Sequence, residues 1–195
     1  MAFEFTNTLK GVVTQSILKA LFERGGYRVT RLEIEELFSE IKHIDLQKYQ
    51  KLNLPLQLRY MPDLLVAEID MSHAFLVEVK FRKRFDENSA QSLFKELERQ
   101  RKYWEQSYAV VMIAEPFVAD RQYHQDFIRV VKPESHSILM DNRLSLAQRW
   151  DSLEHLQRVF KRFNNDSIVH DVQKSADTLT QMLKDLAKLQ MPNET

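Results

Sequence analysis

Two short acidic motifs carry the residues of this chain best suited to chemistry: Pro62-Asp63 and Glu78-Val79-Lys80. Each adjoins an apolar run of strand length, and a polar turn separates the two runs, which predicts a β-hairpin. If Ile69 and Ser72 close that turn, the register places Asp63 directly opposite Glu78. Lys80 lies two residues beyond Glu78 and therefore shares its face of the sheet.

Two carboxylates held that close repel each other and favour the binding of a cation. Mg²⁺ prefers oxygen ligands, so Asp63, Glu78 and the backbone carbonyl of Val79 would bind it together with water. Such an ion lowers the pKa of a bound water and offsets charge on a phosphoryl oxygen, while Lys80 orients that water or stabilises the developing charge. The alternative is a metal-free pair of carboxylates with Lys80 as their salt-bridge partner.

A cluster of cations follows the second motif directly, at Arg82, Lys83 and Arg84. Cations beside a metal site would hold the phosphates of a nucleic acid, and such binding weakens with salt. The chain as a whole has 28 basic and 28 acidic residues and no net charge, so the local cluster matters more than the total. The alternative is a solvated surface whose cations pair with nearby acidic residues.

The surrounding elements follow from hydrophobic periodicity and from glycine and proline. An amphipathic helix over 9–24 ends at Gly25-Gly26. The further expected elements, in chain order, are a strand over 27–34, a short helix over 35–41 with a loop through Pro55, the hairpin, a helix over 89–106, an apolar strand over 108–114 buried on both faces, and a strand over 128–131. A helix between the hairpin and the strand over 108–114 permits a parallel crossover.

The spacing of the two acidic motifs resembles the signature of the PD-(D/E)XK nuclease superfamily, with fourteen residues between Asp63 and Glu78-Val79-Lys80. The segments 10–15 and 21–27 resemble the first helix and glycine turn of archaeal Holliday-junction resolvases. Those proteins usually have glutamate where this chain has Gln15. An amide can hydrogen-bond a metal-bound water but brings no charge, so this departure affects the metal site.

The resemblance implies an α/β fold of the restriction-endonuclease-like type, with a mixed central sheet in the order α-β-β-β-α-β. It implies a DNA nuclease dependent on Mg²⁺ or Mn²⁺, in which Asp63, Glu78, Lys80 and Gln15 are catalytic. Many members carry glutamine or lysine on the helix after the motif, which makes Gln100 a candidate for nucleic-acid binding. The alternative function is an inactive nuclease-like module that binds nucleic acid or protein, supported by Gln15 and the zero net charge.

Residues 1–140 are expected to form the nuclease-like core, and residues 141–195 a helical extension. Apolar residues recur at helical spacing over 144–163 and again over 168–189, with a break at 164–167 where Asp166 or Ser167 could cap the second helix. This helical pair would pack on the core or on a second subunit, which makes a homodimer possible. Tyr103 and Trp104 are expected in the core.

Several other functions are disfavoured by composition. The chain has no cysteine, so disulfides and cysteine-ligated metals are excluded, and its three glycines form no phosphate-binding loop. Its six histidines show no paired zinc-binding spacing. We see neither a signal peptide nor an apolar stretch approaching about 18 residues, and therefore expect a soluble, cytoplasmic protein without membrane contact.

Overall fold

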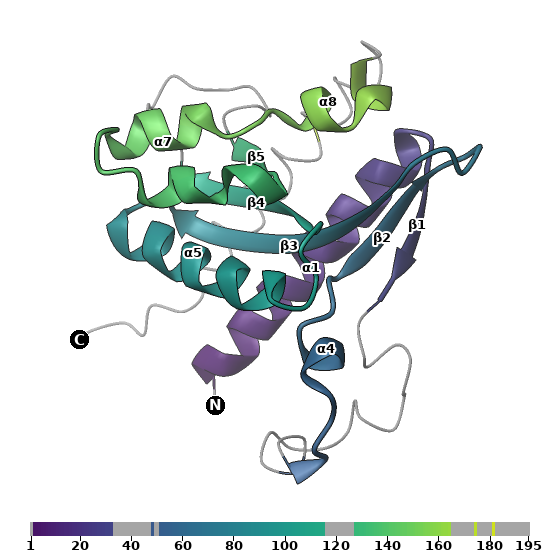
Figure 1. Cartoon of the computed structure of the whole chain (residues 1–195), viewed down its shortest axis with the longest axis horizontal. Helices are drawn as coiled ribbons and strands as arrows, with labels where there is room; N and C mark the ends of the chain where they lie inside the picture. Colours follow the sequence, from purple (N-terminus) through teal and green to yellow (C-terminus); the bar gives the residue numbers. More distant parts are fainter. Residues whose placement is uncertain are drawn as a thin grey trace.

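A computed structural model describes residues 2–32, 48, 51–115, 127–164, 174 and 181. Its fold is mixed α/β, with helices around one sheet (Figure 1). The elements are α1 (Ala2–Arg24), β1 (Tyr27–Arg31), α4 (Leu56–Arg59), β2 (Leu64–Glu68), β3 (Ala74–Arg84), α5 (Glu87–Arg101), β4 (Tyr108–Glu115), β5 (Ile128–Val131), the 3₁₀ helix η2 (Pro133–Met140), α7 (Leu146–Ser152), α8 (Leu156–Val159) and the 3₁₀ helix η3 (Lys161–Asn164).

The five strands form a single sheet in the order β1-β2-β3-β4-β5. All neighbours are antiparallel except β3 and β4, which run parallel. Helix α5 makes the crossover between this parallel pair, as the sequence predicts. The expected succession of a first helix, three strands, a helix and a further strand is therefore present, with the short α4 between β1 and β2.

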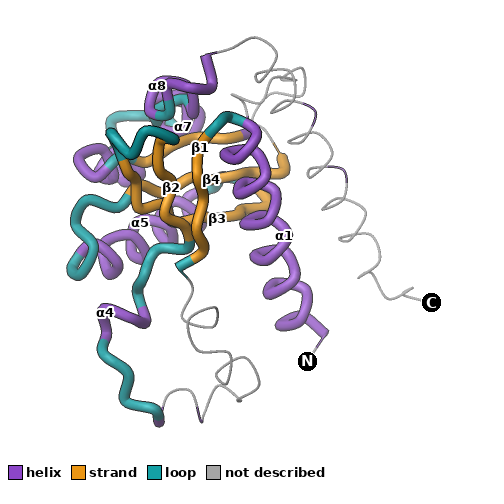
Figure 2. Tube along the Cα trace, turned by 90° about the vertical axis from the view of Figure 1, so that its right-hand side faces the viewer, coloured by secondary structure: helices purple, strands orange, loops and turns teal. Residues whose placement is uncertain are grey.

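Two hydrophobic clusters cover the two faces of the sheet, because strand side chains alternate between faces. On one face α1 packs with Leu18 and Phe22. On the other face α5 packs with Leu93 and Leu97, joined by Trp150 from α7. Figure 2 shows α1 and α5 on opposite sides of the sheet. Glu78 and Lys80 pair with Ala109 and Val111 of β4, and those two β4 residues belong to the α5 side, so both charged residues face α5.

Helix α5 begins and ends earlier than its periodicity predicts. The Asp86 side chain caps the first turn by accepting a hydrogen bond from the Ser89 backbone, and the helix ends at Arg101 rather than at residue 106. The expectation of Tyr103 and Trp104 in the core is wrong. Both are half-buried beside α4, where Tyr103 stacks on Tyr60 with ring centroids 5.5 Å apart and Trp104 donates to the Gln57 carbonyl.

The single helix expected over 144–163 is also wrong. The chain forms α7, α8 and η3 instead, because Glu154 leaves the helical path and pairs with Val130 of β5 through two backbone hydrogen bonds of 2.8 and 3.1 Å. The apolar residues still reach the core. Leu153 lies in the cluster on the α5 side, and Phe160 and Phe163 complete the cluster around α1.

Three expectations fall outside the described residues. They are the short helix over 35–41, the last two residues of the strand expected over 27–34, and the second C-terminal helix, of which only Lys174 and Gln181 are described. The predicted dimer contact through the C-terminal helices falls largely there as well. Within the described ranges, none of the helices combines the length and the apolar character needed to cross a membrane.

Candidate metal and phosphate site

The predicted register of the hairpin is confirmed. Leu64 pairs with Val77 and Ala67 with Ala74, which sets Asp63 opposite Glu78 at the next position. The turn is closed by a hydrogen bond of 2.9 Å from the Glu68 N–H to the His73 carbonyl. Asp63 itself lies just outside β2, where the pairing of β2 with β3 ends.

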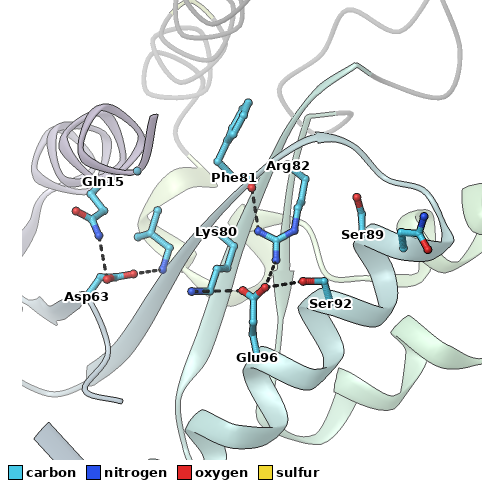
Figure 3. Close-up of a pocket in the computed structure, with 11 residues that line it drawn as sticks. Gln15, Asp63, Lys80, Phe81, Arg82, Ser89, Ser92 and Glu96 are labelled. Atoms are coloured by element: carbon cyan, nitrogen blue, oxygen red, sulfur yellow. Dashed lines mark hydrogen bonds and ion pairs between the residues drawn. The ribbon is translucent and has the colours of Figure 1, made fainter. Parts of the chain in front are cut away.

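Asp63 is anchored at this point by contacts from three segments of the chain. Beyond Val77 strand β3 has no partner in β2, and the Val79 N–H instead donates to Asp63 Oδ2 at 2.6 Å. Gln15 of α1 donates its amide to Asp63 Oδ1 at 2.9 Å (Figure 3). The Asp63 backbone carbonyl accepts from the Leu32 N–H at 2.9 Å. The structure thus brings Gln15 to Asp63, although the two residues lie on different elements.

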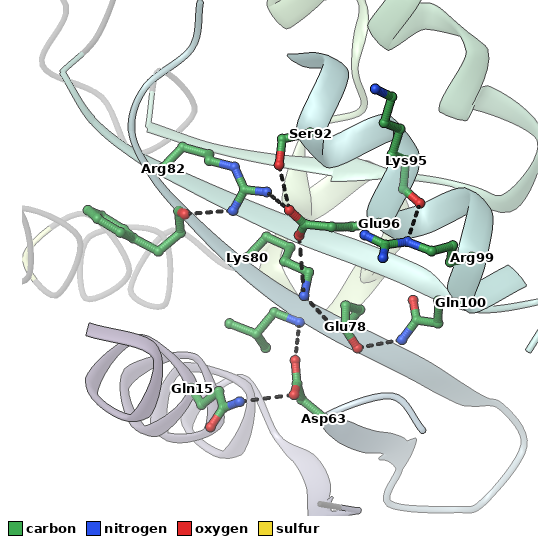
Figure 4. Close-up of polar contacts among 12 residues, drawn as sticks. Gln15, Asp63, Glu78, Lys80, Arg82, Ser92, Lys95, Glu96, Arg99 and Gln100 are labelled. Atoms are coloured by element: carbon green, nitrogen blue, oxygen red, sulfur yellow. Dashed lines mark hydrogen bonds and ion pairs between the residues drawn. The ribbon is translucent and has the colours of Figure 1, made fainter. Parts of the chain in front are cut away.

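Glu78 is buried beneath α5, where two side chains contact its carboxylate. Lys80 Nζ lies 2.6 Å from Glu78 Oε1, and the Gln100 amide donates to Glu78 Oε2 (Figure 4). Gln100 is only 5% exposed, and among the described residues its Oε1 has no hydrogen-bond partner. Gln100 therefore belongs to the site as a contact of Glu78, and its burial argues against the direct contact with nucleic acid expected from the sequence.

Lys80 lies among several negative charges. Burial lowers the pKa of its ammonium group, but the charges of Glu78 and Asp63, followed by Glu96, outweigh burial and raise that pKa. Lys80 is accordingly a protonated cation at neutral pH. It can stabilise negative charge directly, and it is poorly suited to accept a proton.

Glu96 is the residue of this site that sequence reasoning missed. Its Oε1 accepts from Arg82 Nη2 and from Ser92 Oγ, both at 2.8 Å, and its Oε2 lies 3.6 Å from Lys80 Nζ (Figures 3 and 4). Burial raises the pKa of Glu96, but the charges of Arg82 and Lys80 outweigh burial and lower it. A signal was present, because Ser92, Glu96 and Gln100 recur every four residues and so share one face of α5.

A cavity of about 640 Å³ adjoins these groups. It extends from Gln15 and Asp63 past Lys80 to the first turns of α5, where its wall is polar. Its lining residues are Gly11, Gln15, Asp63, Val79, Lys80, Phe81, Arg82, Asn88, Ser89, Ser92 and Glu96. Lys80, Arg82 and Glu96 thus face one shared space (Figure 3).

The three predicted phosphate contacts differ in their surroundings. Arg82 lines the cavity, and its side chain is 17% exposed. Lys83 and Arg84 are exposed on the same strand, where Lys83 lies 3.6 Å from Glu115 and Arg84 lies 2.8 Å from Asp86. Exposed ion pairs contribute little free energy, so Lys83 and Arg84 can exchange these partners for a phosphate easily.

The donor set fits a hard divalent cation. Asp63 and Glu78 supply carboxylate oxygens, and Val79 supplies a backbone carbonyl between Glu78 and Lys80. Within the described ranges, no cluster of three or more histidine, cysteine, aspartate or glutamate side chains has metal-binding geometry, so water would have to complete the shell. Gln15 and Gln100 each orient one of the two carboxylates, which favours a fixed ligand geometry.

Comparisons with known proteins returned no relative. The chain matches no protein-family model, no curated protein and no solved structure. The functional interpretation therefore depends on the residues and contacts described above.

Proposed function

We propose that this protein is a Mg²⁺-dependent nuclease that hydrolyses DNA phosphodiester bonds on a restriction-endonuclease-like core. The observation that carries the proposal is the meeting of Asp63, Glu78 and Lys80 at the end of the β2–β3 pairing, beside a polar cavity. Two carboxylates that can bind a cation and one ammonium that can stabilise developing charge suit metal-dependent hydrolysis of a phosphodiester.

Asp63, Glu78 and the Val79 carbonyl would hold Mg²⁺ or Mn²⁺. The ion would supply a Lewis acid that offsets charge on the phosphoryl group and makes water more acidic. Gln15 keeps Asp63 oriented through its amide, and Gln100 does the same for Glu78. Lys80 stabilises the negative charge that develops on the phosphoryl oxygens, because its raised pKa keeps it protonated.

DNA would approach along the cavity that extends from Asp63 toward α5. Arg82, Lys83 and Arg84 follow the motif along β3 and would contact phosphates next to the reacting one. Such contacts are independent of base sequence, and they predict binding that weakens as salt increases.

A second candidate function is a nuclease-like module that binds nucleic acid or protein without cleaving it. The contacts of the two carboxylates favour it: each of their four oxygens already meets a donor or cation of the chain, from Gln15, Val79, Lys80 and Gln100. A network satisfied in this way is stable without a metal ion.

One assay separates the two functions. Duplex, single-stranded and branched DNA are incubated with Mg²⁺, with Mn²⁺ or with EDTA, and cleavage is compared among the parent, Asp63→Asn and Lys80→Ala. The matched control is Asp70→Asn, an exposed aspartate in the turn of the same hairpin.

We expect metal-dependent cleavage by the parent and the control, with a reduction of about 100-fold or more in both site variants. Absence of cleavage by the parent on every substrate would favour the binding module. Cleavage that both site variants retain at the parent rate would refute the site.

A further inference from the structure

We propose that Glu96 sets the affinity of this protein for DNA by competing with backbone phosphates for the guanidinium group of Arg82. The inference rests on the proposed function, because it assigns a role to a carboxylate in the same cavity. Glu96 then sets DNA affinity without touching either of the two proposed metal ligands or the reacting phosphate.

Arg82 is committed to protein partners within the cavity. Its Nη2 donates to Glu96 Oε1 at 2.8 Å, and its Nη1 donates to the carbonyl of the neighbouring Phe81 at 2.9 Å. The guanidinium lies between β3 and α5 (Figure 3). A phosphate that binds Arg82 through the N–H groups directed at Glu96 and Phe81 must displace those contacts.

Glu96 would keep partners after such a displacement. Ser92 Oγ donates to the same Oε1 at 2.8 Å, and Lys80 Nζ lies 3.6 Å from Oε2. After release of Arg82, Glu96 therefore keeps one hydrogen bond and one nearby positive charge. The exchange does not leave a carboxylate without a partner. These fallback contacts make the Arg82–Glu96 pair exchangeable.

The cavity also explains why Glu96 opposes an anion. Glu96 lines the same space as Arg82, so its carboxylate neutralises the guanidinium group that a phosphate would meet there. The free energy that Arg82 contributes to DNA binding is therefore only the difference between its contact with a phosphate and its contact with the Glu96 carboxylate. Removal of the carboxylate charge should therefore tighten binding.

The test is a double-mutant cycle on DNA affinity, measured by fluorescence anisotropy of a labelled duplex in EDTA over a range of salt concentrations. The variants are Glu96→Gln, Arg82→Gln and the double variant. Glutamine at position 96 keeps the size of the side chain and can still accept from Ser92. The matched control is Glu98→Gln, which removes the same charge from the exposed side of α5.

We expect Glu96→Gln to lower the Kd by about 5- to 10-fold and Glu98→Gln by less than about 2-fold. Arg82→Gln should raise the Kd by about 10-fold and reduce the slope of log K against log salt by about one. The double variant should bind like Arg82→Gln alone, because Glu96 acts through Arg82. In cleavage assays Glu96→Gln should lower KM.

The inference is overturned if Glu96→Gln binds no tighter than Glu98→Gln, or if the tightening persists without Arg82. If Glu96→Gln does not fold, Glu96→Asp serves instead, since its shorter side chain weakens the reach to Arg82 and should give a smaller tightening with the same dependence on Arg82. DNA binding without any effect of residue 96 refutes this inference alone. Absence of DNA binding by every variant in EDTA also refutes this inference, whereas the proposed function is refuted by absence of cleavage with Mg²⁺ and Mn²⁺.

Discussion

Two arginine–glutamate pairs attach α5 to the rest of the protein, and they differ in what surrounds them. Arg149 of α7 contacts both carboxylate oxygens of Glu87 at 2.9 Å, and it also donates to the carbonyls of Leu139 and Leu144. Its side chain is 5% exposed. Arg82 contacts Glu96 through a single oxygen and faces the cavity.

The difference separates a structural contact from an exchangeable one. Arg149 donates to four protein acceptors, two of them backbone carbonyls, and a single phosphate could not replace all four. Arg82 has one carboxylate and one carbonyl of its own strand, and its carboxylate partner retains Ser92 and Lys80 when Arg82 leaves. The same pair of residue types thus joins α7 to one end of α5 through several fixed contacts, and further along the helix it forms the exchangeable contact that we propose competes with phosphate.

The largest effect should come from breaking the structural pair. Arg149→Ala removes a buried side chain and leaves the carbonyls of Leu139, which is buried, and of Leu144 without this donor. We expect a loss of about 3 kcal/mol in the free energy of unfolding, measured by urea denaturation. The DNA affinity of the folded protein should not change. A loss below about 1 kcal/mol would contradict the structural role of Arg149.

An intermediate effect is expected at Gln15, whose amide donates a hydrogen bond to Asp63. Gln15→Glu replaces a donor by a third negative charge next to Asp63. Without metal we expect a loss of about 1 to 2 kcal/mol in stability, which Mg²⁺ should reverse by raising Tm more than it does for the parent. Thermal unfolding with EDTA and with Mg²⁺ measures both, and Gln106→Glu, at an exposed position, is the control. Equal Mg²⁺ shifts in parent and variant would contradict a cation at Asp63.

A smaller effect should follow from breaking the exchangeable pair. Arg82→Ala removes a partly exposed side chain, and Glu96 keeps Ser92 and Lys80. We expect a loss of about 1 kcal/mol or less in stability, against about 3 kcal/mol for the same substitution at Arg149. Urea denaturation of the two variants side by side measures the contrast. Equal losses would remove the distinction between the two pairs.

The smallest effect should appear in acid. The pKa of Glu96 is lowered in the folded protein relative to its usual 4.5, because Arg82 and Lys80 outweigh burial. A carboxyl group with a lowered pKa stabilises the folded state at neutral pH, and this stabilisation disappears as the pH falls from about 5 through the folded pKa. Glu96→Gln should therefore lose less stability than the parent between about pH 6 and pH 3 in urea denaturation. A larger loss of stability in the variant than in the parent would contradict a lowered pKa of Glu96.

The hairpin could be predicted from the sequence because its information is local. Alternation over the two strands and the short polar turn determine the register, which the pairing of Leu64 with Val77 confirms. The parallel crossover to β4 likewise followed from one helix between two apolar strands.

The helix expected over 144–163 shows where local information fails. The segment contains no glycine or proline to interrupt the apolar periodicity. The interruption comes from the pairing of Glu154 with Val130, a contact between distant parts of the chain. Glu96 was missed for a related reason: its partners Arg82 and Lys80 reach it only when α5 packs across β3.

The most direct test of the central claim is the number of Mn²⁺ ions bound, measured by electron paramagnetic resonance in the parent, Asp63→Asn and the control Asp70→Asn, each with and without duplex DNA. If Asp63, Glu78 and the Val79 carbonyl form a metal site, the parent and the control bind Mn²⁺ and Asp63→Asn loses it. A parent that binds no Mn²⁺ under either condition, or an Asp63→Asn variant that binds as much as the parent, would contradict the proposed metal site.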